Sequence, residues 1–589
     1  MNYENFNPRA FLLAQARQLL TQAANAAMAD GSLPQAELPV FITEIPADRK
    51  NGDVASNMAM AGARAWHKAP KMIAEAILAH LPSLQNTCWD RAEVAGPGFI
   101  NLYTGADWLS TVVLAAATNP EYGRTNYGSG QKYNVEFVSA NPTGPMHMGN
   151  ARGGALGDCL AAVLDWAGYQ VTREFYLNDA GNQIQKFGKS LAVRYLQKCL
   201  GEQGYPLPEE CYQGADIMER AVAFGEAHEA EAAPLVEACR ALSGDALYES
   251  EAFAQLKEAL VNFALPINIA NMEKDLGKYR ISYDTWFKES TLHASGACYK
   301  AEDGAIMYRS AQYAAKYGTV NKKKTDDGSE EEAKDEVLVR GNGIPTYFAA
   351  DIAYHYNQLA VRGFDKAIDI WGADHHGHVA RMKGAMDAIG LNGEQLDVVL
   401  MQLVNLMKDG QPVRMSKRSG KAISLTDLLD MVPIDSARFL FNEQQAGSAM
   451  DFDLDLAIKQ DNDNPVYYVQ YAHARICSIL RKLESEGVTY QGAEGWAGYA
   501  FPEASEQELM RLLAAFPAEI VLSAQRYDPA RINHYVTDLA GAFHKCYNSC
   551  RIKDAEPQAQ QARIALCLGA KHVIYSVLSM FKITVPESM

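Results

Sequence analysis

The sequence lacks any run of about eighteen uncharged apolar residues, the length that a membrane-spanning helix requires. Its first residues include the acidic Glu4 and no small-residue cleavage site, unlike a secretory signal. The ten cysteines are scattered among 589 residues without a CxxC pair. Only Cys546 and Cys550 stand four apart, with no second pair at ligand spacing. We therefore expect a cytoplasmic protein without a membrane segment, a disulfide scaffold or a protein-held metal ion.

Positive charge is also scarce, because 54 Lys and Arg stand against 71 Asp and Glu, for a net charge of −17. Such a surface does not attract polyanions non-specifically. The balance reverses from Arg531 to the C-terminus, where seven basic residues stand against four acidic ones. The last part of the chain is therefore the candidate for contact with RNA.

Length and apolar content predict several domains, since 589 residues with 48% hydrophobic content exceed any single small module. Residues 1–115 open with helical periodicity and end in short β-rich runs, which predicts an N-terminal α/β module. Residues 133–179 run in the order strand, Gly/Pro turn, small-residue helix, strand. This order is typical of the parallel sheet of a Rossmann-like domain.

The Rossmann-like domain is predicted to occupy residues 130–454 with one helical insertion. The insertion is the Ala- and Glu-rich stretch at about 182–276, which has helical periodicity. Residues 322–336 carry mixed charge without apolar periodicity and predict a solvated loop. Strand-like sequence then returns at 367–374 and 397–407. Amphipathic helices dominate residues 455–589, which predicts a C-terminal all-α bundle.

The first chemical motif is PMHMGN, residues 145–150, at the turn from the first strand into the small-residue helix. The N-terminus of a helix favours anions, and Gly149 lets the backbone approach a nucleotide closely. His147 and Asn150 are placed there to donate hydrogen bonds to a phosphate. On spacing alone, His147 could equally be a capping or core histidine.

The second motif is the polar loop RMSKRSG, residues 414–420, which precedes a predicted helix. Its cations Arg414, Lys417 and Arg418 suit a polyphosphate leaving group, because a mobile loop can bring charge to the transition state. Taken alone, such a basic loop is more often a solvated turn.

Together the two motifs resemble the HIGH-type and KMSKS-type elements of class I aminoacyl-tRNA synthetases, in the same order along the chain. Asn150 stands where His is common, and Arg414 and Arg418 occupy the outer KMSKS-type positions. Residues 435–438 look like a DALR turn. Further stretches, spread through the chain, are similar to the arginyl-tRNA synthetase family: FVSANPTGPMHMGNARGGALGD, FYLNDAGNQI, PTYFAADIAYHYNQL, WGADHHGHVARM and VRMSKRSG.

This resemblance implies a two-step reaction. The carboxylate of arginine attacks the α-phosphate of ATP, which carries Mg²⁺, and the arginyl group then passes to the terminal adenosine of tRNA. His147, Asn150 and Lys417 are the implied catalytic residues, acting by electrostatic stabilisation. The implied partners are L-arginine and an arginine-specific tRNA, and the implied state is a monomer.

The resemblance also assigns ATP contacts to residues of the two motifs and of the sequence GADHHGH. Three histidines so close together could instead indicate a metal site. We prefer nucleotide contacts, because the resemblance places this stretch beside the ribose and adenine. The implied set is Gly144, His147, Gly149, Asn150, Asp374, His375, Met415, Ser416 and Lys417.

A pocket for arginine must offer carboxylates, because burying an unpaired guanidinium costs several kcal/mol. Tyr347 and Asp351 lie four apart on a predicted helix, and the family pattern assigns them to the guanidinium. It assigns Asn141 and Ser139 to the α-amino and carboxylate end, and gives Glu136 a supporting or ligand-facing role. The alternatives are an ordinary helix face and, for Glu136, a strand-end salt bridge.

The family pattern gives tRNA binding to the C-terminal bundle and to one turn of the N-terminal module. Aromatic side chains and cations there suit unstacked bases, although each could instead be a buried helix-face residue. The candidates are Phe99, Asn101, Tyr468, Gln470, Tyr471, Arg475, Tyr547, Asn548 and Arg551.

Two kinds of rival function remain at this stage. Another class I synthetase is disfavoured, because a cysteinyl enzyme needs a thiol–zinc site and a glutamyl pocket needs cations. The other rival is a non-catalytic paralogue that binds tRNA.

Overall fold

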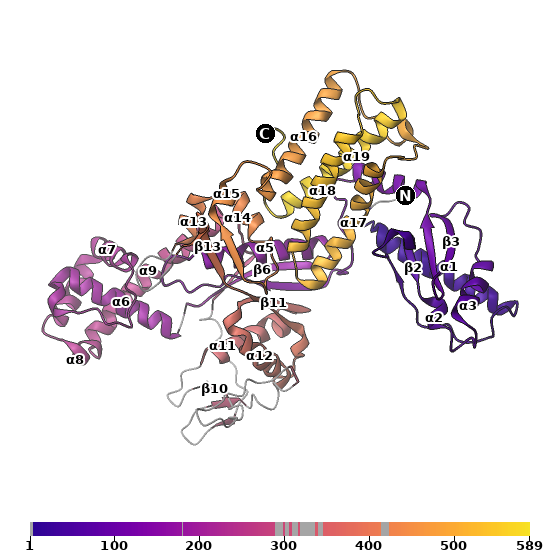
Figure 1. Cartoon of the computed structure of the whole chain (residues 1–589). Coiled ribbons are helices and arrows are strands. Elements are labelled where there is room, and N and C mark those ends of the chain that lie inside the picture. Colours follow the sequence, from indigo (N-terminus) through magenta and orange to yellow (C-terminus); the bar gives the residue numbers. More distant parts are fainter. Residues whose placement is uncertain are drawn as a thin grey trace.

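The computed structural model describes residues 4–179, 181–288, 299–300, 306–308, 316–317, 336–339, 346–413 and 423–589. Met415, Ser416 and Lys417 of the basic loop lie outside these residues, as does most of the predicted loop at 322–336. Within the described part, an N-terminal α/β module, a central parallel sheet with a helical insertion, and a C-terminal helical bundle follow one another (Figure 1).

The N-terminal module pairs helices with a four-stranded antiparallel sheet of order β1-β2-β4-β3. Its first helix begins at an Asn7 cap, whose side chain accepts a hydrogen bond from the Ala10 amide at 3.1 Å. The elements are α1 (Pro8–Ala29), β1 (Thr43–Glu44), β2 (Val54–Ser56), α2 (Met58–Ala61), α3 (Pro70–Ala79), β3 (Trp89–Ala95), β4 (Phe99–Thr104) and α4 (Ala106–Thr118).

The centre of the molecule is a five-stranded, fully parallel sheet of order β12-β11-β5-β6-β7. The chain builds outward from β5 through β6 to β7 and then returns to place β11 and β12 on the other side. Ligands bind where strand order reverses in this way, here at the carboxyl ends of β5 and β11. The strands are β5 (Lys132–Glu136), β6 (Gln170–Leu177), β7 (Thr285–Lys288), β11 (Lys366–Gly372) and β12 (Leu396–Met401).

The small-residue helix predicted after β5 is α5 (Gly149–Trp166), almost wholly buried. Its glycines permit close packing on the sheet, since a Cβ added at Gly157 would lie 2.2 Å from the Phe137 ring. Two further helices pack around this end of the sheet: α11 (Tyr347–Tyr356), which continues as a π-helical turn (Asn357–Val361), and α12 (His376–Ala388).

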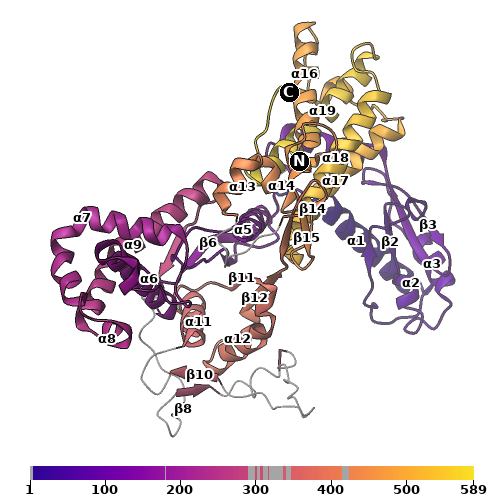
Figure 2. The same cartoon turned by 60° about the vertical axis from the view of Figure 1, so that its left-hand side comes forward.

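The helical insertion projects away from the sheet and has a hydrophobic core of its own (Figure 2). The structure confirms the helices that the sequence predicts there: α6 (Gly181–Leu200), α7 (Ala215–Cys239), α8 (Gly244–Tyr248) and α9 (Glu251–Lys278). A small antiparallel sheet of β8 (Tyr299–Lys300), β9 (Ile306–Tyr308) and β10 (Glu336–Val339) follows. Glu336, predicted as the end of a loop, therefore begins a strand.

The strand expected at 397–407 is wrong as one unit, because β12 ends at Met401 and β13 (Val404–Lys408) belongs to a different sheet. That sheet also holds β14 (Gln411–Pro412) and β15 (Met450–Asp453). The helices nearby are α13 (Leu425–Met431), α14 (Ile434–Leu440) and α15 (Leu454–Ile458). The DALR-like sequence at 435–438 lies within α14, so it is a helix and not the expected turn.

The bundle consists of α16 (Pro465–Ser485), α17 (Ala504–Arg526), α18 (Ala530–Ser549) and α19 (Pro557–Met580). Of the described helices, α19 alone is long and apolar enough to cross a membrane by length and composition. This helix packs against the other helices of the bundle and against α4 of the N-terminal part of the chain. In its most apolar stretch of eighteen residues, 67% is buried. These contacts account for its apolar character as a core helix.

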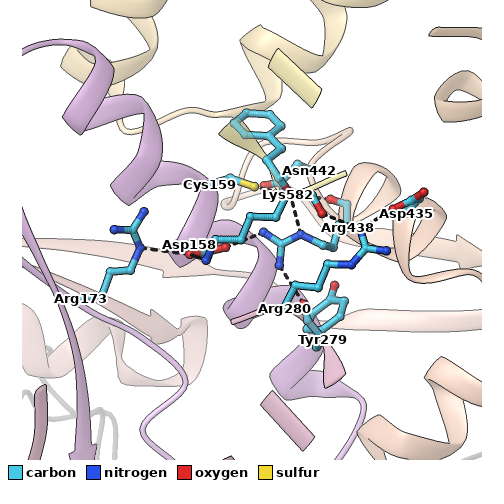
Figure 3. Close-up of polar contacts among 10 residues, drawn as sticks. Asp158, Cys159, Arg173, Tyr279, Arg280, Asp435, Arg438, Asn442 and Lys582 are labelled. Atoms are coloured by element: carbon cyan, nitrogen blue, oxygen red, sulfur yellow. Dashed lines mark hydrogen bonds and ion pairs between the residues drawn. The ribbon is translucent and has the colours of Figure 1, made fainter. Parts of the chain in front are cut away.

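The bundle is joined to the sheet through Asp158 of α5, which is almost fully buried (Figure 3). Its carboxylate accepts hydrogen bonds from Arg438 of α14 at 2.5 Å, Lys582 after α19 at 2.9 Å and Arg173 of β6 at 3.0 Å. Burial by itself would raise the pKa of Asp158, but these three cations hold it below its ordinary value. One carboxylate thus connects three segments that are distant in sequence.

Arg438 extends this junction through its other donors. It donates to the main-chain oxygens of Phe581 at 2.7 Å and Tyr279 at 3.0 Å. Beside it, Arg280 pairs with Asp435 at 2.6 Å (Figure 3). The C-terminal tail, the end of the insertion and α14 are therefore held together at the base of the bundle.

Candidate active site

Two cavities adjoin at the carboxyl ends of β5 and β11. One has a volume of about 490 Å³ and is lined by His147, Gly149 and Asn150. The other has a volume of about 590 Å³ and is lined by residues of α11 and α12 together with Glu136. They share five lining residues, Val138, Ile370, Gly372, Asp374 and His375. Two ligands held in these cavities would therefore meet at a common wall.

The turn before α5 forms part of the wall of the first cavity, which we call the nucleotide cavity. The amide of His147 donates to the side chain of Asn150 at 3.1 Å, which fixes the two predicted phosphate donors in one turn. The amide of Met148 donates to the Ile423 oxygen at 3.0 Å, and the amide of Leu425 donates to the Met146 oxygen at 3.0 Å. The segment that follows the basic loop is thus tied directly to the PMHMGN motif.

The helix after that loop is started by a capping box, in which Ser424 and Asp427 exchange hydrogen bonds. Asp374 and His375, to which the sequence resemblance assigns ATP contacts, also line the nucleotide cavity. Gly144 lines neither cavity, and a Cβ added there would lie 3.2 Å from Asp216 of the insertion.

The second cavity, which we call the amino-acid cavity, brings together all five residues predicted to bind substrate: Glu136, Ser139, Asn141, Tyr347 and Asp351. Tyr347 and Asp351 lie on one face of α11, as their spacing predicts. Asp351 stands 3.2 Å from the ring of His378 on α12. A carboxylate and a phenol at the mouth of an acidic cavity can hold a planar cation.

The loop after β5 carries backbone strain at the wall between the cavities. Val138 and Ser139 both have positive φ angles, 71° and 39°. Such conformations cost about 1–3 kcal/mol for non-glycine residues and are concentrated at functional sites. The strained turn directs Ser139 toward the sheet, where its hydroxyl oxygen accepts a hydrogen bond from the Tyr176 amide at 3.1 Å.

Beneath the amino-acid cavity, three carboxyl groups form a row across the sheet. Glu174 of β6 pairs in register with Glu136 of β5, which pairs in register with Asp369 of β11. All three are buried. Of the three, only Glu136 was predicted from the sequence; the signal for Glu174 and Asp369 is an acidic residue followed by apolar or aromatic residues toward the carboxyl end of a strand.

Arg152 is another residue at the site that no sequence motif indicated. It is buried in α5 and donates to three main-chain oxygens, those of Gln402 at 2.7 Å, Ser448 at 2.9 Å and Gln445 at 3.0 Å. Gln402 lines the nucleotide cavity, so Arg152 fixes part of the cavity wall to the helix. Burial lowers the pKa of this guanidinium, as expected where carbonyls are its partners.

Several of the predicted tRNA residues gather between α16 and α18. Arg475 donates to the ring of His544 at 3.1 Å and to Asn548 at 3.2 Å, and its guanidinium lies 4.8 Å from the Tyr547 ring centre. Tyr471 stacks on His544 with ring centres 5.6 Å apart. Burial, together with Arg475, lowers the pKa of His544 to about 4, so the ring is neutral and can accept this hydrogen bond.

The other tRNA candidates are placed less uniformly. Tyr468 also packs on the His544 ring, Arg551 is exposed just after α18, and Phe99 is half-buried at the start of β4. Asn101 is only 2% exposed within β4. Gln470 is buried and donates to Asp435 at 3.0 Å and to the Thr584 oxygen at 2.8 Å. Gln470 is thus engaged within the protein and Asn101 is buried, so we remove both from the candidate tRNA surface.

The sequence matches three families in order along the chain. Residues 14–104 match the arginyl tRNA synthetase N terminal domain, residues 113–207 match the class I (R) tRNA synthetase catalytic domain, and residues 469–589 match the DALR anticodon binding domain. An arginine–tRNA ligase of Ruminiclostridium cellulolyticum is 47% identical over 98% of both chains. One of Caldanaerobacter subterraneus is 48% identical over 97% of this chain and 98% of its own.

Solved structures share the fold. An arginyl-tRNA synthetase of Thermus thermophilus superposes with a TM-score of 0.67 over 97% of this chain and all of its own, at 19% identity. One of Plasmodium falciparum gives 0.66 over 98% of this chain and 99% of its own, at 15% identity. The parallel sheet and the turn before α5 define the catalytic core of a class I aminoacyl-tRNA synthetase. Within that class, the chain belongs to the arginyl-tRNA synthetase family.

Proposed function

We propose that the protein attaches L-arginine to its cognate tRNA in two steps, using ATP with Mg²⁺ as a substrate complex. In the first step, a carboxylate oxygen of arginine bonds to the α-phosphorus of ATP, and pyrophosphate leaves. In the second, a ribose hydroxyl of the terminal adenosine attacks the arginyl carbonyl, and AMP leaves. The observation that carries this proposal is the pair of cavities with a common wall, together with family membership.

In the nucleotide cavity, His147 and Asn150 would donate to the phosphate as charge develops on it, and Gly149 leaves room for the nucleotide. Lys417 would add its charge from the basic loop, which lies outside the described residues. The hydrogen bonds that join residues 423–425 to the PMHMGN motif support a concerted role for the two motifs.

In the amino-acid cavity, we assign the guanidinium to Asp351 and Tyr347. Ser139 and Asn141 lie on the loop after β5, nearer the common wall, and we assign them to the α-amino and carboxylate end. This orientation would direct the carboxylate of arginine toward the nucleotide cavity. Glu136 lies at the floor of the cavity and adds negative charge when ionised.

For tRNA, we propose the face formed by Tyr468, Tyr471, Arg475, Tyr547, Asn548 and Arg551 as the surface that receives unstacked bases. Phe99 marks a second, smaller contact on the N-terminal module. We further propose that the protein acts as a monomer in the cytoplasm, as the resemblance to its family implies.

The test is ATP-dependent charging of unfractionated tRNA with each of the twenty amino acids. We expect arginine alone to be attached. Asp351→Asn should lower kcat/KM for arginine by about 30-fold or more, since a charge pair lost in a binding site costs about 2–5 kcal/mol. Tyr347→Phe should lower it by about three- to tenfold.

Tyr356→Phe is the matched control, because Tyr356 lies on the same helix, is 42% exposed like Tyr347, and does not line the amino-acid cavity. Its kcat/KM should equal that of the unaltered protein. Charging of another amino acid, or full arginine activity in Asp351→Asn, would contradict the pocket assignment. Absence of charging with any amino acid would favour the tRNA-binding paralogue.

A further inference from the structure

The carboxyl row beneath the amino-acid cavity has an unusual charge balance. Glu174, Glu136 and Asp369 stand at the same level on three adjacent parallel strands. Neighbouring strands lie about 4.8 Å apart, and residues in register point to the same face. Like charges placed side by side on one face repel each other, more strongly where water is excluded. Each ionised carboxylate in this row therefore needs a cation.

The two outer carboxylates have cations. Glu174 pairs with Arg362 at 2.6 Å and also accepts from the Tyr354 hydroxyl at 2.7 Å. Asp369 lies 2.8 Å from the Nε2 atom of His355. Burial alone would lower the pKa of His355, but the charge and hydrogen bond of Asp369 raise it to about 9, so this imidazole is protonated at neutral pH.

The middle carboxyl group has no such cation. Among the described residues, no lysine or arginine forms an ion pair with Glu136, which accepts instead from the Ser139 hydroxyl. His355 approaches it but is already engaged by Asp369. Three carboxyl groups thus share two cations, and the unmatched one is 6% exposed and lines the floor of the cavity.

Charged and titratable groups of the other elements around the cavity do not reverse this balance. Asp351 of α11 lies 3.2 Å from the ring of His378 of α12. The Asp351 carboxylate therefore has a partner of its own. Arg381 of α12 also lines the cavity and donates to a main-chain oxygen of its own helix at 3.0 Å. Tyr283, which packs near β5, donates its hydroxyl to a main-chain oxygen at 3.1 Å.

We propose that Glu136 carries a proton while the amino-acid cavity is empty and releases it when a cationic group of the substrate arrives. The cation of the substrate then pairs with the ionised Glu136, so that each of the three carboxylates has a cation. The proton passes to solvent. Burial and the neighbouring charge of Asp369 raise the pKa of Glu136 well above its ordinary value, in agreement with this geometry. The proposal rests on the assignment of the cavity to arginine.

Calorimetric titration of the full-length protein with L-arginine tests this coupling. Binding is measured at pH 7 in phosphate and in Tris, whose ionisation enthalpies differ, so that the difference in observed heat gives the number of protons released. We expect release of about half to one proton by the unaltered protein. The affinity for arginine should also rise with pH, by up to about tenfold per unit, where Glu136 is protonated in the free protein.

Glu136→Gln keeps the shape and removes the proton, so its binding heat should be the same in both buffers after correction for dilution. Its midpoint of unfolding should not fall, because an uncharged amide replaces a carboxyl group that is already uncharged while the cavity is empty. Glu258→Gln, which makes the same change at an exposed carboxylate of α9 that lines neither cavity, is the matched control and should retain the proton release.

Equal heats in both buffers for the unaltered protein, or proton release that persists in Glu136→Gln, would overturn the proposal. If Glu136→Gln binds arginine too weakly to titrate, the arginine-induced infrared difference spectrum of the unaltered protein decides. It should show loss of a protonated carboxyl band and gain of a carboxylate band, and absence of this change would refute the coupling. Undiminished arginine binding in Asp351→Asn would instead refute the pocket assignment itself.

Discussion

At the scale of single residues, His355 shows how a buried ion pair can position a helix that lines the amino-acid cavity. Its Nδ1 atom lies 2.7 Å from the Asp351 main-chain oxygen within α11, and its Nε2 atom lies 2.8 Å from Asp369 on β11. A protonated imidazole can donate to both at once. The face of α11 that presents Tyr347 and Asp351 is therefore fixed to the sheet by a charged hydrogen bond.

This pair predicts a pH dependence of stability. The pKa of His355 is about 9 in the folded protein, against 6.5 as its ordinary value, so the pair contributes fully below pH 6.5 and is lost as pH rises through 9. A shift of this size corresponds to about 3 kcal/mol. We expect the free energy of unfolding of the unaltered protein to exceed that of His355→Gln at pH 6, with the difference shrinking toward pH 10 in urea denaturation. A constant difference over this range would contradict the assignment of charge.

Residue types at the site were predictable where a short motif carries them. His147, Asn150, Tyr347 and Asp351 occupy the cavities that their motifs indicate. Glu174 was not predictable as a neighbour of Glu136, because the two residues lie on different strands and only register brings them together. Spacing along the chain carries no information about such pairs.

At the scale of elements, α5 depends on the absence of side chains. A Cβ at Gly157 would meet the Phe137 ring at 2.2 Å, and one at Gly154 would meet the Ile281 side chain at 2.6 Å. The helix starts directly after the turn that carries His147, so its distance from β5 sets the position of that side chain. Small residues here are a requirement of close packing between helix and strand.

Gly157→Ala should therefore destabilise the protein by about 1–3 kcal/mol through overpacking. Gly277→Ala is the matched control, since Gly277 lies within α9 and nothing would contact its Cβ. Replacement at that helical position should raise stability by up to about 1 kcal/mol. Thermal unfolding of the two variants measures the contrast, and equal midpoints would show that α5 can move away from the sheet without cost.

The sequence predicted the elements that have a strong local periodicity, but it did not predict that β12 ends at Met401. The sequence from 397 to 407 is apolar throughout most of its length, so it gives no sign of a break at Gln402 and Leu403. The break arises because Val404–Lys408 pairs with β15, from later in the chain. Leu403, which lies between β12 and β13 where the chain passes from one sheet to the other, is 83% exposed.

At the scale of the whole molecule, the buried cluster around Asp158 joins the catalytic sheet to the bundle. It connects α5, which begins at the nucleotide cavity, to the C-terminal tail after α19. The relative position of the two proposed substrate surfaces therefore depends on one carboxylate and its cations (Figure 3).

Arg438→Met should destabilise the protein by about 3 kcal/mol, because it removes a charge partner of a buried carboxylate and leaves two main-chain oxygens without their donor. Arg438→Lys should recover only part of this loss, since an ammonium cannot reach all three partners at once. The midpoint of urea unfolding measures both effects.

Arg481→Met provides the control, because Arg481 forms an exposed pair with Glu587 at 3.9 Å and should change stability by less than about 0.5 kcal/mol. If Arg438→Met proves no more harmful than Arg481→Met, the junction does not depend on this cluster.

The sequence by itself determined the class of fold, the order of its parts and the motifs that place the protein in its family. Helical and strand periodicities, turn residues and cations near a predicted turn act over a few residues, so they can be read along the chain. Tertiary structure alone decided which side chains are buried and which become neighbours. Asn101 and Gln470 are buried and so are withdrawn from the candidate tRNA surface, and strand register places Glu136 between two other carboxyl groups at the amino-acid cavity. Both outcomes depend on contacts between distant segments, which no local pattern records.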